Sequence, residues 1–124
     1  MKKLLIVIAS VAVGACSGPS SDEIEELQNV DLLPLHMMAK IDPSGYGCPN
    51  DASGLEKMGL FQKKKCLGMY SSISNVTIKS CIEKEKTVFV CSYSYEFSSE
   101  KYGIHPFDAQ GSYEEMPDGW VFKH

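Results

Sequence analysis

The sequence predicts a small α+β domain, in which an N-terminal helix packs on a curved antiparallel sheet of about four strands stapled by disulfides. Three observations lead to this prediction. Residues 20–41 open with a helix-capping pattern, and residues 75–122 alternate apolar and polar side chains between turn signals. Four cysteines lie within residues 48–91, an even number in a short chain. A helical segment followed by consecutive strands is typical of the α+β class.

The predicted helix begins after Ser20. The Ser20 side chain can accept from the amide of Glu23 while the Glu23 carboxylate reaches back, which is the capping-box arrangement. Further acidic residues in the first turns suit the positive end of the helix dipole. Pro34 is expected to stop or kink this helix, or to be the first residue of a second short helix through Ile41.

The middle of the chain carries few signals of regular structure. Residues 45–54 are rich in Gly, Pro, Asn and Asp and are expected to form a loop. Residues 55–62 can form one or two helical turns. The lysine run 63–65 follows and is read as a solvated surface, with contact to anionic lipid headgroups or an acidic partner as the alternative.

The second half has the two-residue period of strands. Residues 75–83 and 86–97 are predicted to pair as a hairpin, with a turn at 83–86. Residues 100–106 are expected to be a loop, and residues 107–115 a third strand. Pro117-Asp118-Gly119 signals a tight turn, and residues 120–122 a short fourth strand. The strands therefore form a meander.

Sequence proximity favours two disulfides, Cys81–Cys91 across the hairpin and Cys48–Cys66 closing a loop, although four cysteines allow three pairings. The alternation presents a difficulty, because Cys81 lies on the polar face of its strand and Cys91 on the aromatic face of the next. Two cysteines that lie directly opposite each other must share a face of the sheet. Three explanations remain open: both faces of the sheet are covered, a bulge shifts the alternation, or the cysteines pair differently.

The N-terminus carries the most specific motif. Met1-Lys2-Lys3 precedes an apolar run too short to span a bilayer, and the run ends in Val13-Gly14-Ala15-Cys16. This pattern resembles the lipobox of bacterial lipoproteins. The resemblance implies cleavage after residue 15, acylation of Cys16, and, with Ser17 rather than Asp next, sorting to the outer membrane facing the periplasm.

The resemblance to lipoproteins sets the expected organisation: signal peptide 1–15, lipidated tether 16–20, and one small domain 21–124. The capped helix, the cysteine-bearing strands and the closing run Asp118-Gly119-Trp120-Val121-Phe122 together resemble small lipoproteins with a cystatin-like or NTF2-like domain. That resemblance implies a helix wrapped by a sheet and no particular activity.

Composition narrows the function. The chain has no arginine, and the mature part keeps ten lysines against sixteen acidic residues, a net charge of −6. An acidic surface without arginine disfavours nucleic acid as a partner. The three histidines have no ligand spacing, so we expect no metal and no cofactor.

No catalytic constellation stands out. His105 lies near Asp108, but in a predicted loop where a surface histidine is the simpler interpretation. Glu114 and Glu115 are adjacent on a strand and point to opposite faces. No serine lies in a nucleophile elbow. We therefore expect a protein that is not an enzyme.

Three functions remain. The first is a non-enzymatic protein-binding lipoprotein, such as an immunity, exclusion or envelope-assembly factor, whose partner is an envelope or exogenous protein. The second is inhibition of a cell-wall hydrolase, because Gln110-Gly111-Ser112-Tyr113 loosely resembles the inserted G-x-x-Y region of lysozyme-inhibitor lipoproteins. The third is a small-ligand pocket between helix and sheet, lined by Trp120 or by the tyrosines. The aromatic row Tyr93, Tyr95, Phe97 and Tyr102 is expected to be the core side of the sheet, with a binding surface as the alternative.

Overall fold

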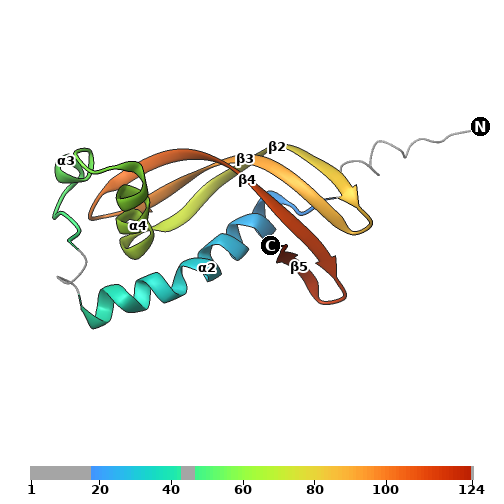
Figure 1. Ribbon diagram of the computed structural model, residues 1–124, viewed down its shortest axis with the longest axis horizontal. Helices are drawn as coiled ribbons and strands as arrows, with labels where there is room; N and C mark the ends of the chain where they lie inside the picture. The colour runs from blue at the N-terminus through green and yellow to red at the C-terminus, as the bar shows by residue number, and fades with distance from the viewer. Residues whose placement is uncertain (1–17, 43–46, 124) are drawn as a thin grey trace, which may run out of the picture.

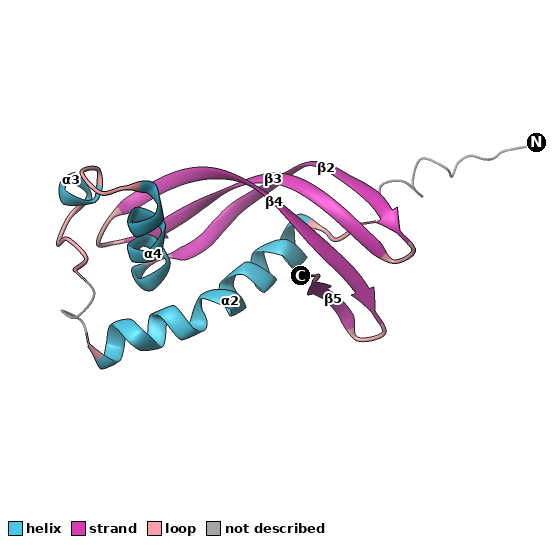
Figure 2. Ribbon diagram, viewed as in Figure 1, coloured by secondary structure: helices cyan, strands magenta, loops and turns pink. Residues whose placement is uncertain are grey.

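The computed structural model describes residues 18–42 and 47–123 and shows helices on one face of an open sheet (Figures 1 and 2). The helices are α2 (Ser21–Ile41), α3 (Ala52–Leu55) and α4 (Leu60–Tyr70). The strands β2 (Ser72–Glu85), β3 (Val88–Ser99), β4 (Gly103–Met116) and β5 (Gly119–Phe122) pair antiparallel in that order. The predicted α+β meander is confirmed. The predicted signal segment and its acylated Cys16 lie outside the described residues.

Helix α2 begins as its sequence predicts. The Ser20 side chain accepts from the amide of Glu23 at 3.1 Å, and the Ser20 amide donates to a Glu23 carboxylate oxygen at 2.8 Å. The helix does not end at Pro34, so the expectation of a second helix starting there is wrong. Pro34 has no N–H group to donate to the Val30 carbonyl, which is its usual acceptor four residues earlier in the helix. Both residues are exposed, so water can hydrate that carbonyl instead.

Packing against α4 holds the second half of α2 in place. Gly68 of α4 is buried, and a Cβ built on it would lie 2.8 Å from Leu35 Cδ1 and 3.2 Å from Leu32 Cδ2. The two helices therefore approach as closely as they do because residue 68 has no side chain. This tertiary contact outweighs the local effect of the proline.

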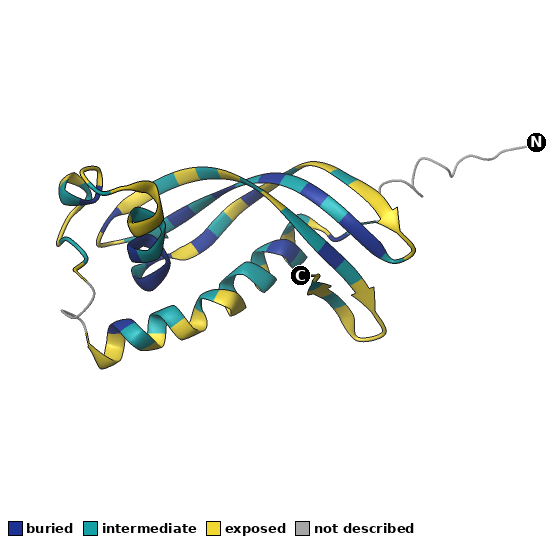
Figure 3. Ribbon diagram, viewed as in Figure 1, coloured by how far each residue is buried: buried dark blue, intermediate teal, exposed yellow. Residues whose placement is uncertain are grey.

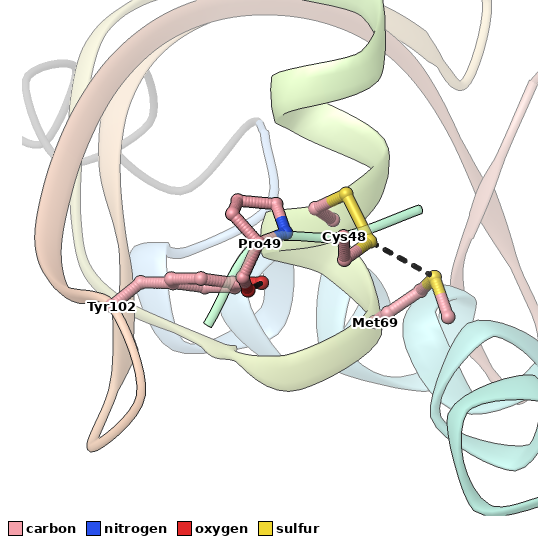
Figure 4. Close-up of a disulfide and its surroundings, with 5 residues drawn as sticks. Cys48, Pro49, Met69 and Tyr102 are labelled. Atoms are coloured by element: carbon pink, nitrogen blue, oxygen red, sulfur yellow. Dashed lines mark hydrogen bonds between the residues drawn. A yellow bond between two sulfur atoms is a disulfide. The ribbon is translucent and has the colours of Figure 1, made fainter. Parts of the chain in front are cut away.

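The segment between α2 and the sheet is more helical than predicted. The expected turns over 55–62 are displaced: α3 ends at Leu55 and α4 starts at Leu60, and the lysine run lies within α4. Cys48 and Cys66 form a disulfide, as proximity favoured, which ties the preceding loop to α4. Figure 4 shows this staple, with Cys48 Sγ 3.9 Å from Met69 Sδ and the Tyr102 hydroxyl donating to the Pro49 carbonyl at 2.6 Å.

Strand β4 starts at Gly103, so residues 103–106 are strand where a loop was expected. The reason is that Pro106 lies on an open edge, since β5 pairs only with residues 113–116 of β4. The Ser112 carbonyl accepts from the Lys123 amide on that open side of β4. Residues 106 and 112 are an even number of positions apart, so the backbone polar groups of residue 106 point to the same side. A proline there costs the sheet no hydrogen bond.

A bulge resolves the conflict over the second disulfide. Ile78 lies opposite Tyr93 and Cys81 opposite Cys91, so three steps along β2 match two along β3, and the register shifts between Ile78 and Ser80. The extra residue places Cys81 on the same face as Ile78. The predicted Cys81–Cys91 bond then forms directly across the hairpin.

The core lies between the helices and the concave face of the sheet (Figure 3). Residues of β3 alternate between buried and half-buried along the strand. The buried members point toward the helices and are aromatic or apolar: Phe89, Cys91, Tyr93, Tyr95 and Phe97. From the helices, Ile24, Leu55 and Leu67 complete the core and are fully buried.

Candidate functional site

A row of exposed apolar side chains runs along α2 on the side turned away from the core. Their exposed fractions range from 53% to 80%, and their spacing of three, four and four residues places them on one side of a helix. The members are Val30, Leu33, Met37 and Ile41. We call them the α2 stripe. The helix thus has two apolar faces, and only the one bearing Ile24, Leu32 and Leu35 meets the fold.

Side-chain hydrogen bonds fix α2 on the edge of the sheet and thereby orient the stripe. The Asn29 amide group donates to the Ile73 carbonyl at 3.0 Å and accepts from the Ile73 amide at 2.8 Å. His36 Nε2 lies 2.7 Å from the Ser71 carbonyl. In the core, Gln28 donates to the Tyr93 hydroxyl, which accepts from Tyr113 at 3.1 Å. These bonds satisfy buried polar groups only at one rotation of the helix.

An acidic hollow of about 320 Å³ borders the N-terminal end of the stripe, between α2 and β5. Its walls include the carboxylates of Glu23, Glu26 and Asp118. Its apolar lining comes from Val30, Leu27 and Trp120, whose ring meets Phe89 edge-on at 5.6 Å between centroids. Trp120, which the sequence offered as a residue lining a pocket between helix and sheet, lines this hollow.

A larger groove of about 630 Å³ borders the other end of the stripe. It lies between α2 and the junction of α4 with β2, and its lining is mainly apolar, with Leu33, Met37 and Met69 among the members. Ser71 also lines it and is 3% exposed. Within the described part of the chain its hydroxyl has no hydrogen-bond partner, a condition that costs about 1–3 kcal/mol in a buried group.

The aromatic row predicted from sequence belongs to the core. Tyr93, Tyr95 and Tyr102 are 2%, 7% and 2% exposed, so they offer no binding surface. Burial, with a smaller effect of Tyr93, raises the pKa of Tyr95 to about 12. Burial, reinforced by the hydrogen bond with Tyr93, raises the pKa of Tyr113 well above its ordinary value. Both phenols therefore stay neutral over the physiological range.

The segment compared with lysozyme inhibitors lies inside β4. Tyr113 is fully buried, and its ring packs on Phe122 with centroids 5.2 Å apart. A cleft-inserting loop needs a projecting segment, whereas residues 110–113 lie within a paired strand and only Gln110 among them is exposed. The geometry gives that resemblance no support.

The remaining candidate residues are separated or already occupied. His105 Nε2 lies 2.7 Å from the Tyr102 carbonyl, whereas Asp108 pairs with Lys79 at 2.9 Å, and three strand positions place the two on opposite faces. In the lysine run, Lys63 pairs with Glu56 at 2.8 Å and Lys64 lies 5.0 Å from the Phe107 ring centroid. That ion pair lowers the pKa of Glu56, chiefly through the Lys63 hydrogen bond.

Neither a cluster of metal-binding side chains nor a helix of membrane-spanning character lies within the described ranges. Residues 18–42 and 47–123 contain no group of three or more His, Cys, Asp or Glu side chains placed to hold a metal ion. None of the helices in these ranges combines the length and the apolar content needed to cross a bilayer.

The α2 stripe was not predicted from the sequence, although Val30, Leu33, Met37 and Ile41 are all apolar. The signal was present: positions 30, 33, 37 and 41 form a second row at helical spacing, opposite the row that contains Leu32 and Leu35.

Comparison of the chain with known proteins found no matching family model, no similar curated protein and no similar solved structure.

Proposed function

We propose that this chain is a bacterial lipoprotein, anchored in the outer membrane through acylated Cys16 and facing the periplasm, that binds another protein without catalysing a reaction. The lipobox-like run ending at Cys16 supports the anchor. The observation that carries the binding role is the α2 stripe, an apolar helix face fixed in orientation and left uncovered within the described chain. Immunity, exclusion and envelope-assembly factors are the classes that fit.

The stripe matches a helix or groove on a partner. Apolar residues spaced by three and four positions are the anchors that helix-in-groove recognition uses. Fully burying such a side chain contributes about 1.5–3 kcal/mol, so burying the exposed fractions of four of them contributes on the order of 5 kcal/mol. Association itself costs about 4–15 kcal/mol. The stripe alone therefore gives weak binding, and the partner must also contact the surface around it.

The charge around the stripe indicates the chemistry of that partner. Glu23, Glu26 and Asp118 surround the hollow at its N-terminal end. The mature chain also has six more acidic residues than lysines. A basic protein surface next to an apolar strip complements both features, and opposite charge raises the association rate.

Site-specific photocrosslinking in cells tests the proposal. A photoreactive side chain at Ile41 should give a discrete adduct with a second protein, whereas the same group at Ile82, on β2 and 56% exposed, should not. The adduct should disappear when Val30→Glu is added, because a carboxylate in the stripe opposes burial. Equal adducts at both positions would contradict the proposal, and adducts of the chain with itself would reassign the stripe to a dimer.

Acylation has its own test. Cys16→Ala should remove the mass of the lipid and release the chain from membranes. Membrane retention and unchanged lipid labelling of this variant would contradict the anchor, independently of the result at the stripe.

The groove supports a second candidate function, the binding of a small amphipathic ligand. Its apolar lining suits an alkyl chain, and Lys40 at its wall suits a carboxylate headgroup. Dodecanoate should bind saturably to the chain, and Leu33→Glu should abolish the binding. Ile104→Glu, at an exposed apolar site on β4, is the matched control and should leave it unchanged. Equal loss in both variants would dismiss the groove.

A further inference from the structure

The chain is already fixed to the domain two residues after Cys16. A Cβ on Gly18 would lie 3.0 Å from the Cys81 Cβ and 3.7 Å from Phe89 Cδ2, so the Gly18 backbone rests directly against the β2–β3 hairpin. Pro19 is buried, and Ser20 is held in the capping box. The polar tether expected over residues 16–20 is therefore shorter than its sequence suggests, because three of its five residues are packed.

The remaining reach is small. Two peptide units separate the Cα atoms of Cys16 and Gly18, which gives at most about 7.6 Å. This inference rests on the proposed acylation of Cys16. We infer that the β2–β3 hairpin end of the domain lies against the headgroup surface of the bilayer, and that α3, α4 and the C-terminal end of α2 point away from it.

The strand order defines which parts share the membrane end. Val88, at the start of β3, lies opposite both Glu85 of β2 and Glu114 of β4, so the β2–β3 and β4–β5 turns are neighbours. Figure 1 shows α3 and α4 at the other end of the long strands. The fourteen residues of β2 span about 45 Å if straight, which sets the scale of the separation.

The short connection to Cys16 sets the orientation, and charge does not. The β2–β3 hairpin carries Glu83, Lys84, Glu85 and Lys86, whose charges cancel, and the neighbouring β4–β5 end adds Glu115 and Asp118. The mature chain as a whole is acidic, and anionic headgroups attract basic segments, not acidic ones. No net attraction therefore draws the body of the domain down onto the bilayer.

The orientation bears on the α2 stripe. Helix α2 runs from Ser21 toward the end of the domain that bears α4, and its 21 residues cover about 31 Å. Met37 and Ile41 are then presented far from the headgroups, where a periplasmic partner can reach them. The acidic hollow lies nearer the membrane.

Energy transfer to labelled lipid tests the orientation. The sole tryptophan, Trp120, lies on β5 opposite Glu115, near the membrane end. The acylated chain is placed on phosphatidylethanolamine–phosphatidylglycerol vesicles that carry dansyl headgroups. A distal probe is made by combining Trp120→Phe with Phe61→Trp, at an α4 position that is 79% exposed. If that variant does not fold, Ile104→Trp, 63% exposed at the distal start of β4, replaces Phe61→Trp in the same background.

Transfer from Trp120 should be severalfold more efficient than transfer from the distal probe. Inserting about twelve Gly/Ser residues between Ser17 and Gly18 adds about 20 Å of flexible reach and should remove most of the difference. Equal transfer from the two probes, or no effect of the insertion, would overturn the inference while leaving acylation intact. Absence of the lipid mass from the wild-type chain would instead overturn the anchor and the orientation together.

Discussion

Asn29 is the residue whose removal should most clearly uncouple α2 from the sheet. Its side chain exchanges two hydrogen bonds with the backbone of Ile73, as a neighbouring strand would. Ile73 is 3% exposed, so Asn29→Ala leaves a buried amide and a buried carbonyl without partners. Each unpaired group costs about 1–3 kcal/mol. Alanine returns about 0.5 kcal/mol through its higher helix propensity. The expected net loss of unfolding free energy is about 2–5 kcal/mol.

Urea unfolding with the disulfides intact, followed through Trp120 fluorescence, measures this loss. The midpoint should fall while the slope m stays unchanged, because the same surface is exposed on unfolding. Gln62→Ala, an exposed polar residue on α4, is the matched control and should alter stability by less than about 0.5 kcal/mol. If Asn29→Ala behaves like the control, the Ile73 backbone groups are satisfied without the helix, and the account of how the α2 stripe is oriented fails.

Three further outcomes follow from the buried groups. Raising the pH above the ordinary tyrosine pKa should lower the free energy of unfolding by up to about 1.4 kcal/mol per pH unit for each tyrosine whose pKa is raised, because the phenol loses its proton first in the unfolded chain. In urea titrations at increasing pH, Tyr95→Phe should therefore reduce the loss of stability between pH 10 and 12, whereas Tyr113 extends the loss to higher pH. An unchanged pH dependence in Tyr95→Phe would contradict the raised pKa. Replacing Cys48 and Cys66 together by Ala should cost about 3 kcal/mol for a loop of 18 residues, and a change under 1 kcal/mol in thermal unfolding would argue against this staple. Gly68→Val should lower the melting temperature, because its Cβ alone would lie 2.8 Å from Leu35 Cδ1 of α2; an unchanged temperature would show that the two helices separate freely.

Local patterns were sufficient where the interaction itself is local. Ser20 and Glu23 are three residues apart, so the capping box could be read directly and is confirmed. The two-residue period located the strands of the meander, because one face of an open sheet must be buried. Short sequence separation also identified the partners of Cys48 and Cys81.

The predictions were wrong where a distant contact decides. Pro34 signals a helix end, yet α4 packs against Leu32 and Leu35 and keeps α2 continuous. Pro106 signals a loop, yet β5 is too short to cover β4 at that point, and an open edge accepts proline. The bulge after Ile78 leaves no mark in the alternation, since it is set by the pairing with β3.

The candidate site shows the same division. The sequence predicted Trp120 as a candidate pocket residue, and for the aromatic row Tyr93–Phe97 it favoured the core side of the sheet over a binding surface. Burial decides that question in favour of the core. The α2 stripe, the groove with its unpaired Ser71 hydroxyl, and the packed tether at Gly18 required the tertiary structure.

By itself, the sequence determined the class of the fold, the start of its helix and the order of its strands, and it favoured the two disulfides that form, because caps, alternation and short cysteine spacings act between residues close along the chain. Tertiary structure decided which of the two apolar faces of α2 is buried, where β2 bulges and how Gly18 packs against the β2–β3 hairpin. Those features depend on how one segment packs on another, and a one-dimensional pattern does not record which surface will cover a given side chain.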